Sequence, residues 1–188
     1  MQQAGTDVKE AYIHAKMKQF KLVDMRQQYS ELIAEAEKDS MEYKDFLIRL
    51  LSVEEEGKNA RRHEKLLGSA CFDSSSTLKD IDYSFNTGLD KDKIEELGSL
   101  RFLDANENII VIGPPGVGKS MIATGIGRNA CQAGRSVLFV NAKELVDKLH
   151  DEMMKGQLAQ MLKKLNKIDL LIIDELSYIK MDKEKGGH

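Results

Sequence analysis

The stretch "NIIVIGPPGVGKSMIATGI", from Asn108 to Ile126, decides the fold class of this 188-residue chain. A run of branched apolar residues leads into a turn rich in glycine and proline, and helix-forming residues follow. Gly113, Gly118 and the pair Lys119–Ser120 fit the pattern G-x-x-x-x-G-K-[ST], which requires a strand before it and a helix after it. The sequence therefore predicts a strand, a phosphate-binding turn and a helix in succession.

The composition of this turn suits a chain of phosphates. Glycines allow backbone N–H groups to approach phosphate oxygens closely, prolines stiffen the entry, and the helix N-terminus adds positive charge. We expect the Lys119 ammonium to reach the β and γ phosphates and the Ser120 hydroxyl to ligate Mg²⁺. The expected nucleotide contacts are Gly113, Pro114, Pro115, Gly116, Val117, Gly118, Lys119, Ser120 and Met121.

A second chemical element is "LLIIDEL", Leu170 to Leu176, in which two acids end an apolar strand. Ligands bind at this end of the strands in open α/β sheets. Taken alone the pattern is weak, but its distance after the turn strengthens it. We expect Asp174 to hold the Mg²⁺ shell and Glu175 to polarise a water for attack on the γ-phosphate, which favours hydrolysis over transfer to a small molecule.

The second half of the chain alternates strands and helices, which predicts a parallel sheet covered on both faces. The helix after the turn should be closed by Gly134. The next helix should begin at Ala142, with Asn141 as its cap and Glu144 as the partner of that cap. The expected strands are 108–112, 136–141 and 168–173, and the expected helices are 119–132, one from Ala142, and 157–165.

The first half predicts an all-α hairpin. An amphipathic helix is expected over 10–37, and a second should begin at Asp39, which forms a capping-box pattern with Glu42. The apolar stripe of the second helix is Tyr43, Phe46, Leu47, Leu50 and Leu51. The short link predicts antiparallel packing, and Gly57 is expected to mark a bend. An irregular linker over 68–89 should lie along a surface through Phe72, Ile81, Tyr83 and Phe85, followed by a short helix near 90–103.

Beyond its apolar part, the second helix carries a basic stripe at helical spacing: Lys58, Arg61, Arg62 and Lys65. It is either a solvated face or a contact for DNA or another anionic partner. The net charge of −3 gives no global attraction to nucleic acid. The apolar runs are too short to span a membrane, the N-terminus lacks a signal peptide, and Cys71 and Cys131 suit reduced cytoplasmic thiols.

Several stretches together resemble the IstB-like ATP-binding proteins, the helper ATPases of IS21-type insertion sequences. They are "GPPGVGKSMIA", "ACQAGRSVLFVNAKELVDKL", "DLLIIDELSYIKMDKE", "KLVDMRQQYSEL" and "TLKDIDYSFNTGLDKDKIEELGSLRFLDANENI". The resemblance covers about Met17 to Glu184 and implies a P-loop NTPase of the AAA+ type, preceded by the helical hairpin. It implies ATP and Mg²⁺ as cofactors, duplex DNA and a transposase as partners, and an ATP-dependent homo-oligomer. By the matching motifs, the turn is Walker A, Asp174 is the Walker B acid and Glu175 is the catalytic glutamate.

We expect three regions: a helical adaptor over 1–67, a linker with a short helix over 68–106, and a partial ATPase core over 107–188. The family continues past the point where this sequence stops, so the resemblance implies a shortened core without sensor 1 and the arginine finger. ATPase turnover is therefore an open question, and the facing edges of strands 108–112 and 168–173 should be unpaired. Helicase loaders of the DnaC type, a non-hydrolysing ATP-binding interaction module and a nonfunctional relic stay open as alternatives.

Overall fold

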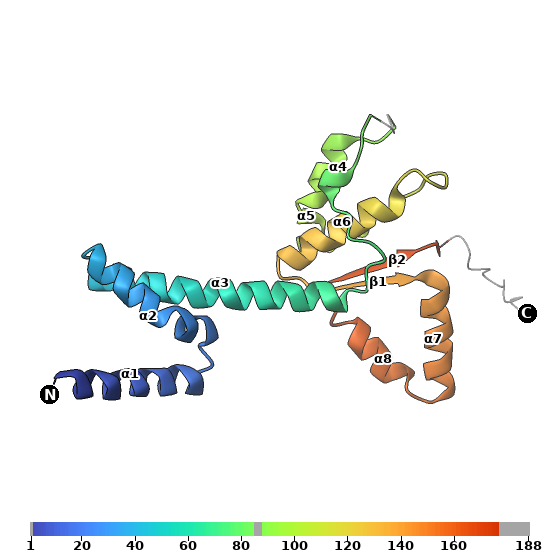
Figure 1. The fold of residues 1–188 in the computed structure, drawn as a ribbon. Coiled ribbons are helices and arrows are strands. Elements are labelled where there is room, and N and C mark those ends of the chain that lie inside the picture. The colour runs from blue at the N-terminus through green and yellow to red at the C-terminus, as the bar shows by residue number, and fades with distance from the viewer. Residues whose placement is uncertain (1, 85–87, 177–188) are drawn as a thin grey trace, which may run out of the picture. The chain divides into compact units, whose positions relative to one another are not determined.

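A computed structural model describes residues 2–84 and 88–176, with side chains from residue 8 onward. The chain forms two compact units, Met1–Arg62 and His63–His188. The first is helical, and the second combines helices with a small parallel sheet (Figure 1). Among the described residues, none of the helices combines the length and apolar character that a membrane span requires.

The first unit contains α1 (Gln2–Gln19), α2 (Val23–Lys38) and the part of α3 (Tyr43–Ser69) up to Arg62. The expected single helix over 10–37 is thus two helices, because Lys21 adopts a left-handed φ of 57° that breaks the hydrogen-bond ladder. The second expected helix begins at Tyr43 and not at Asp39, which instead ends α2 as its C-cap.

The core of this unit confirms the antiparallel hairpin of α2 and α3. Met25 and Tyr29 of α2 pack with Leu50 and Val53 of α3, and Met17 of α1 joins the cluster. The expected stripe was only partly right. Phe46 and Leu50 face the core, whereas Tyr43, Leu47 and Leu51 are exposed.

A buried carboxylate fixes the start of α2. Leu22 precedes this helix and supplies no side-chain cap. Glu54 of α3, only 4% exposed, accepts hydrogen bonds from the backbone N–H groups of Asp24 (2.9 Å) and Met25 (3.1 Å). Gly57 marks no bend, since α3 runs on through it. A Cβ there would lie 2.1 Å from the carboxyl carbon of Asp24, so the glycine makes room for that side chain.

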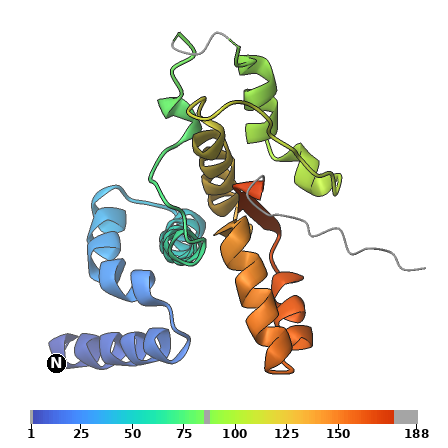
Figure 2. The ribbon, with the colours of Figure 1, turned by 90° about the vertical axis from the view of Figure 1, so that its right-hand side faces the viewer.

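The second unit begins with the end of α3 and continues through short helices into an α/β segment. Its elements are the 3-10 turn η1 (Leu78–Asp80), α4 (Lys91–Gly98), α5 (Arg101–Asp104), α6 (Lys119–Gln132), β1 (Val137–Asn141), α7 (Ala142–Met154), α8 (Leu158–Leu165) and β2 (Leu170–Asp174). The expected helix near 90–103 is two helices, α4 and α5, divided where Leu100 takes a φ of 66°. Figure 2 shows α4, in green, beside α6.

The linker after α3 lies along the rest of its unit, as expected. Ile81 is buried with residues of α4 and α6, and Tyr83 packs against that cluster. Phe72 contacts Phe139 of β1 edge-to-face at 6.1 Å between ring centroids. Phe85 lies outside the described residues. The Phe72 ring also lies close to α6. This approach depends on Gly127, where a Cβ would stand 2.7 Å from the ring.

The two strands form a parallel pair, with Val137 opposite Leu170 and Asn141 opposite Asp174. The prediction of parallel strands at these positions is confirmed. Helices α7 and α8 connect the two strands along the chain, and these helices pack against each other. Beyond α6, Gly134 adopts a φ of 77° and closes that helix as expected, with the Arg135 N–H donating to the Ala130 carbonyl at 2.9 Å.

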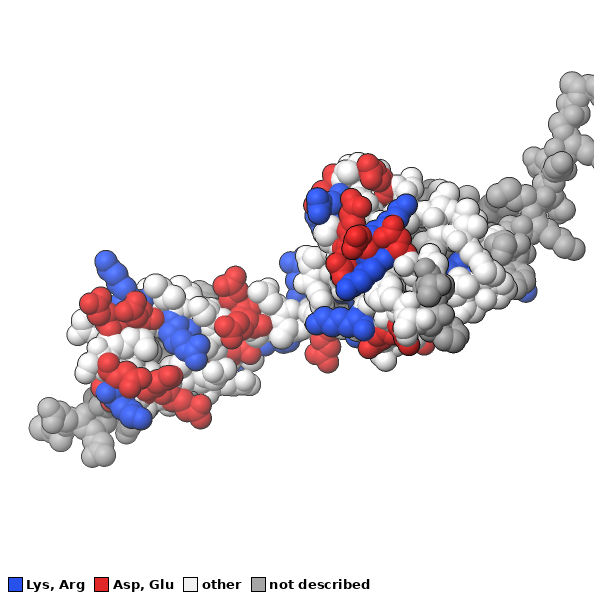
Figure 3. Space-filling view, turned by 90° about the horizontal axis from the view of Figure 1, so that it is seen from above, with Lys and Arg blue, Asp and Glu red and all other residues white. Residues whose placement is uncertain are grey.

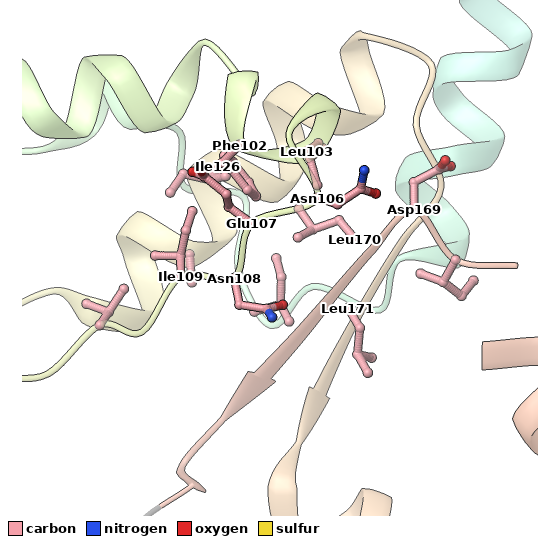
Figure 4. A pocket seen from close by; sticks show the side chains of 14 residues that line it. Phe102, Leu103, Asn106, Glu107, Asn108, Ile109, Ile126, Asp169, Leu170 and Leu171 are labelled. Atoms are coloured by element: carbon pink, nitrogen blue, oxygen red, sulfur yellow. The ribbon is translucent and has the colours of Figure 1, made fainter. Parts of the chain in front are cut away.

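The predicted strand over 108–112 is wrong: this segment is irregular, and the sheet of the described residues has two strands. A strand needs a neighbour for its backbone hydrogen bonds, and none lies against this segment in the described residues. A cavity of about 380 Å³ separates residues 106–111 from residues 168–172 of the β2 edge (Figure 4). In the described residues β2 pairs with β1 alone, so its other edge is unpaired as expected, and Ile110 and Ile112 are 83% and 90% exposed.

Candidate nucleotide site

The glycine-rich turn adopts the backbone that phosphate binding requires. Gly116 and Gly118 have φ values of 80° and 89°, a left-handed region that side chains disfavour. Gly118 is also the N-cap residue of α6, so the turn leads directly into the first helical turn. The free N–H groups and the positive end of the helix dipole are therefore directed toward the turn. Open space surrounds the Cβ position of Gly116, which leaves that side of the turn accessible.

Lys119 and Ser120, the two side chains that the motif assigns to phosphate and metal, stand at the start of α6. The Lys119 ammonium donates a hydrogen bond of 2.8 Å to the Pro114 carbonyl oxygen within the same turn. The cation is thus held at the mouth of the turn by a neutral acceptor. A bound phosphate oxygen would replace that acceptor with a stronger, charged one.

The two acids end β2, as expected. Asp174 is the last residue of the strand, and Glu175 follows with a left-handed φ of 57°. The Asp174 carboxylate accepts a hydrogen bond of 2.8 Å from the Glu175 N–H. A left-handed φ is uncommon for a residue other than glycine and is found mostly where function or packing requires it.

One cavity of about 580 Å³ brings the two elements together. Its walls include Gly113, Gly116, Lys119 and Ser120 from the turn, and Asp174 and Glu175 from the end of β2. Backbone donors, a lysine, a hydroxyl and carboxylates are the groups that a magnesium–phosphate ligand needs. Mg²⁺ usually takes one or two carboxylates and completes its shell with phosphates and water, so a dense ligand cluster is not required.

Asn141, expected from the sequence only as a helix cap, also bonds a residue of the cavity wall. Its Oδ1 accepts a hydrogen bond of 2.9 Å from the Lys143 N–H, which confirms the cap of α7. Its Nδ2 donates to Oε2 of Glu175, across the parallel pair. The signal was present in the sequence, because polar residues that end two adjacent parallel strands meet at the same edge of the sheet.

The basic stripe is partly neutralised by acids. Lys58 Nζ lies 3.4 Å from Glu54 Oε1, and Arg61 lies 2.7 Å from Asp24 Oδ2. Arg62 is exposed on α3 in the first unit, and Lys65 is exposed in the second unit. Acidic and basic side chains also alternate on the face drawn in Figure 3. Lys58 and Arg61 therefore form ion pairs within the protein, and the DNA contact of the stripe stays a prediction.

The remaining reactive side chains form no further site in the described part of the chain. Residues 2–84 and 88–176 contain no group of three histidine, cysteine or acidic side chains placed to hold a metal. Cys131 is fully buried, which raises the pKa of its thiol, and Cys71 is exposed as a free thiol. Neither cysteine lines the cavity beside the glycine-rich turn.

A glycine-rich turn at a helix N-terminus, facing two acids at the end of a parallel strand, defines the class of P-loop nucleotide-binding proteins. A family model described as "IstB-like ATP binding protein" matches residues 15–188. The chain belongs to this family.

Individual relatives agree with that assignment. The chain is 32% identical to an ATP-binding protein of insertion sequence IS21 from Pseudomonas aeruginosa, over 91% of the chain and 64% of the relative. It is 34% identical to that of IS5376 from Geobacillus stearothermophilus, over 90% and 68%. Identity to that of IS232 from Bacillus thuringiensis subsp. berliner is 29%, over 87% and 66%. The matched part of the chain spans about two thirds of the length of these relatives.

Proposed function

We propose that the chain binds Mg-ATP in the cavity between the glycine-rich turn and the end of β2. The observation that carries the proposal is that Lys119, Ser120 and both acids line one cavity, although more than fifty residues separate the two pairs in sequence. The turn and Lys119 hold the phosphates, Ser120 and Asp174 hold the metal, and Met121 adds packing near the turn. The ion supplies charge neutralisation at the phosphates.

Binding of a fluorescent ATP analogue tests this proposal. Lys119→Ala removes the cation that faces the phosphates and should weaken binding by at least about tenfold. Lys148→Ala, which removes an exposed lysine of α7 away from the cavity, is the matched control and should leave the affinity unchanged. Asp174→Asn should reduce the dependence on Mg²⁺. Saturable binding that Lys119→Ala does not alter would show that the nucleotide lies elsewhere.

Whether the bound nucleotide turns over depends on Glu175. We propose that its carboxylate orients the attacking water once Asn141 releases it. The hydrogen bond from Asn141 occupies one oxygen of this carboxylate, and this observation favours a second candidate, nucleotide binding without hydrolysis. Phosphate release above the level of Lys119→Ala, lost in Glu175→Gln, supports the ATPase. Tight binding with no release supports the non-hydrolysing module.

We further propose that this nucleotide site serves DNA transposition by directing a transposase on duplex DNA. The support is the family and the names of the three relatives given above, which are insertion-sequence proteins and favour transposition over helicase loading. For the DNA contact, Arg62→Glu reverses one exposed charge of the basic stripe. It should weaken duplex binding and reduce the salt slope by about 1. An unchanged slope would assign Arg62 to the solvated face.

A further inference from the structure

Helix α3 carries a second apolar face besides the one that packs into the first unit. Leu50 and Val53 are buried, 8% and 5% exposed. Tyr43, Leu47, Ile48 and Leu51 are exposed by 94%, 55%, 61% and 53%. A group of large apolar side chains on one helix, each more than half exposed, is typical of an interaction surface and not of a solvated face.

The second face has the spacing of a helix-pairing seam. Lys44, Ile48, Leu51 and Glu55 follow one another at intervals of four, three and four residues. This alternation places them on one line along the helix, as in the seam of a coiled coil. The line has an apolar centre, a base at one end and an acid at the other. Within the described residues, neither Lys44 nor Glu55 takes part in an ion pair.

We propose that this seam pairs with the same seam of a second copy of the chain, in antiparallel orientation. The positions of Lys44 and Glu55 at opposite ends of the seam favour a second copy of the chain as the partner. About an axis between Arg49 and Leu50, Ile48 of each copy meets Leu51 of the other, and Lys44 meets Glu55. Lys44 and Glu55 stand about 16 Å apart along the helix, at equal distances from the axis. A parallel pair would oppose like charges, so the seam complements itself only in the antiparallel arrangement.

The size of the seam sets the strength of the association. Three helical turns bury less than the roughly 800 Å² per partner of a standard stable interface. The dimer should therefore form at micromolar protein and depend on concentration. It needs no nucleotide, since none of its residues lines the cavity beside the glycine-rich turn. Dimerisation and ATP binding are therefore independent, and either one can be absent while the other is present.

Sedimentation equilibrium of the full chain without nucleotide, from low to high micromolar protein, tests the pairing. Ile48→Asp/Leu51→Asp buries charge at the seam and should raise the dissociation constant by at least about tenfold. Both residues are exposed in the single chain, so circular dichroism should stay native. Arg49→Glu reverses a charge off the seam and is the matched control. A chain that is monomeric throughout, or association that the double substitution leaves intact, overturns the proposal.

A charge swap tests the orientation. Lys44→Glu alone, or Glu55→Lys alone, places like charges across the pair and should weaken the dimer by about threefold. Lys44→Glu together with Glu55→Lys restores opposite charges only if the helices run antiparallel. Recovery of the original dissociation constant supports the arrangement. A double variant that is as weak as the single variants, or weaker, overturns it.

Discussion

Replacing the buried carboxylate of Glu54 should loosen α2 selectively. In Glu54→Ala, the N–H groups of Asp24 and Met25 lose their acceptor, and Lys58 and Arg61 lose a neighbouring negative charge. Each hydrogen bond to a charged group contributes about 1.5–3 kcal/mol, whereas the ion pairs with the half-exposed Lys58 and Arg61 add little. We therefore expect a loss of about 3–5 kcal/mol in the stability of the first unit, mainly from the two unpaired N–H groups.

Hydrogen exchange measured by mass spectrometry checks this directly. A loss of that size lowers amide protection in peptides from α2 by about two to three and a half orders of magnitude. Peptides from α6, in the second unit, report whether the change is local. Glu54→Gln keeps an acceptor for the N–H groups but removes the charge, and it should fall between the native chain and the alanine variant.

Glu56→Ala, an exposed glutamate on the same helix, is the control and should leave α2 unchanged. Protection of α2 in Glu54→Ala that stays within about threefold of native would contradict this expectation, because the carboxylate would then contribute less than about 1 kcal/mol.

Two further predictions concern the second unit. Hydrogen bonds from Ser136 hold the pKa of Asp169 below its ordinary value. This carboxylate therefore stabilises the fold at pH values above its unfolded pKa of about 4. Its contribution is lost as the pH falls through the lower pKa of the folded state. In urea titrations, Asp169→Ala should unfold earlier at pH 7 and lose less stability than the native chain on acidification; parallel curves would contradict this. Gly127→Ala places a Cβ 2.7 Å from Phe72 and 2.8 Å from Ile172. Despite the better helix propensity of alanine, this change should lower the free energy of unfolding by about 1–2 kcal/mol, which appears as a lower urea midpoint. An increase in that midpoint would show that the Phe72 ring moves aside freely.

The geometry of the candidate nucleotide site was largely predictable from sequence because its signals are local. The turn between Gly113 and Ser120 carries its own backbone requirements, and the acids follow a strand whose apolar run is unbroken. The strand pair itself was also predictable, since 136–141 and 168–173 alternate with helical segments. Strand 108–112 failed because a strand forms only with a neighbour, and a neighbour is not a property of the segment.

The errors in the first unit have a similar origin. Helical spacing placed Leu47 and Leu51 in the core, but two apolar faces fit on α3 and the spacing alone does not say which one packs. Glu54 gives only a weak signal because it is one of three consecutive glutamates, although it lies four residues after the buried Leu50 and thus on the core face. The break at Lys21 depends on a backbone angle that lysine rarely adopts, and no residue preference announces it.

The double attachment of Asn141 links the architecture of α7 to the chemistry of the cavity. Its oxygen holds the first turn of the helix, and its nitrogen holds Glu175. Exchanging that single nitrogen for oxygen, as in Asn141→Asp, preserves the cap but sets two carboxylates against each other. In that variant, repulsion should drive the Glu175 carboxylate toward solvent while α7 keeps its cap. One atom of residue 141 can therefore change the reactivity of the site without changing the folding of the helix.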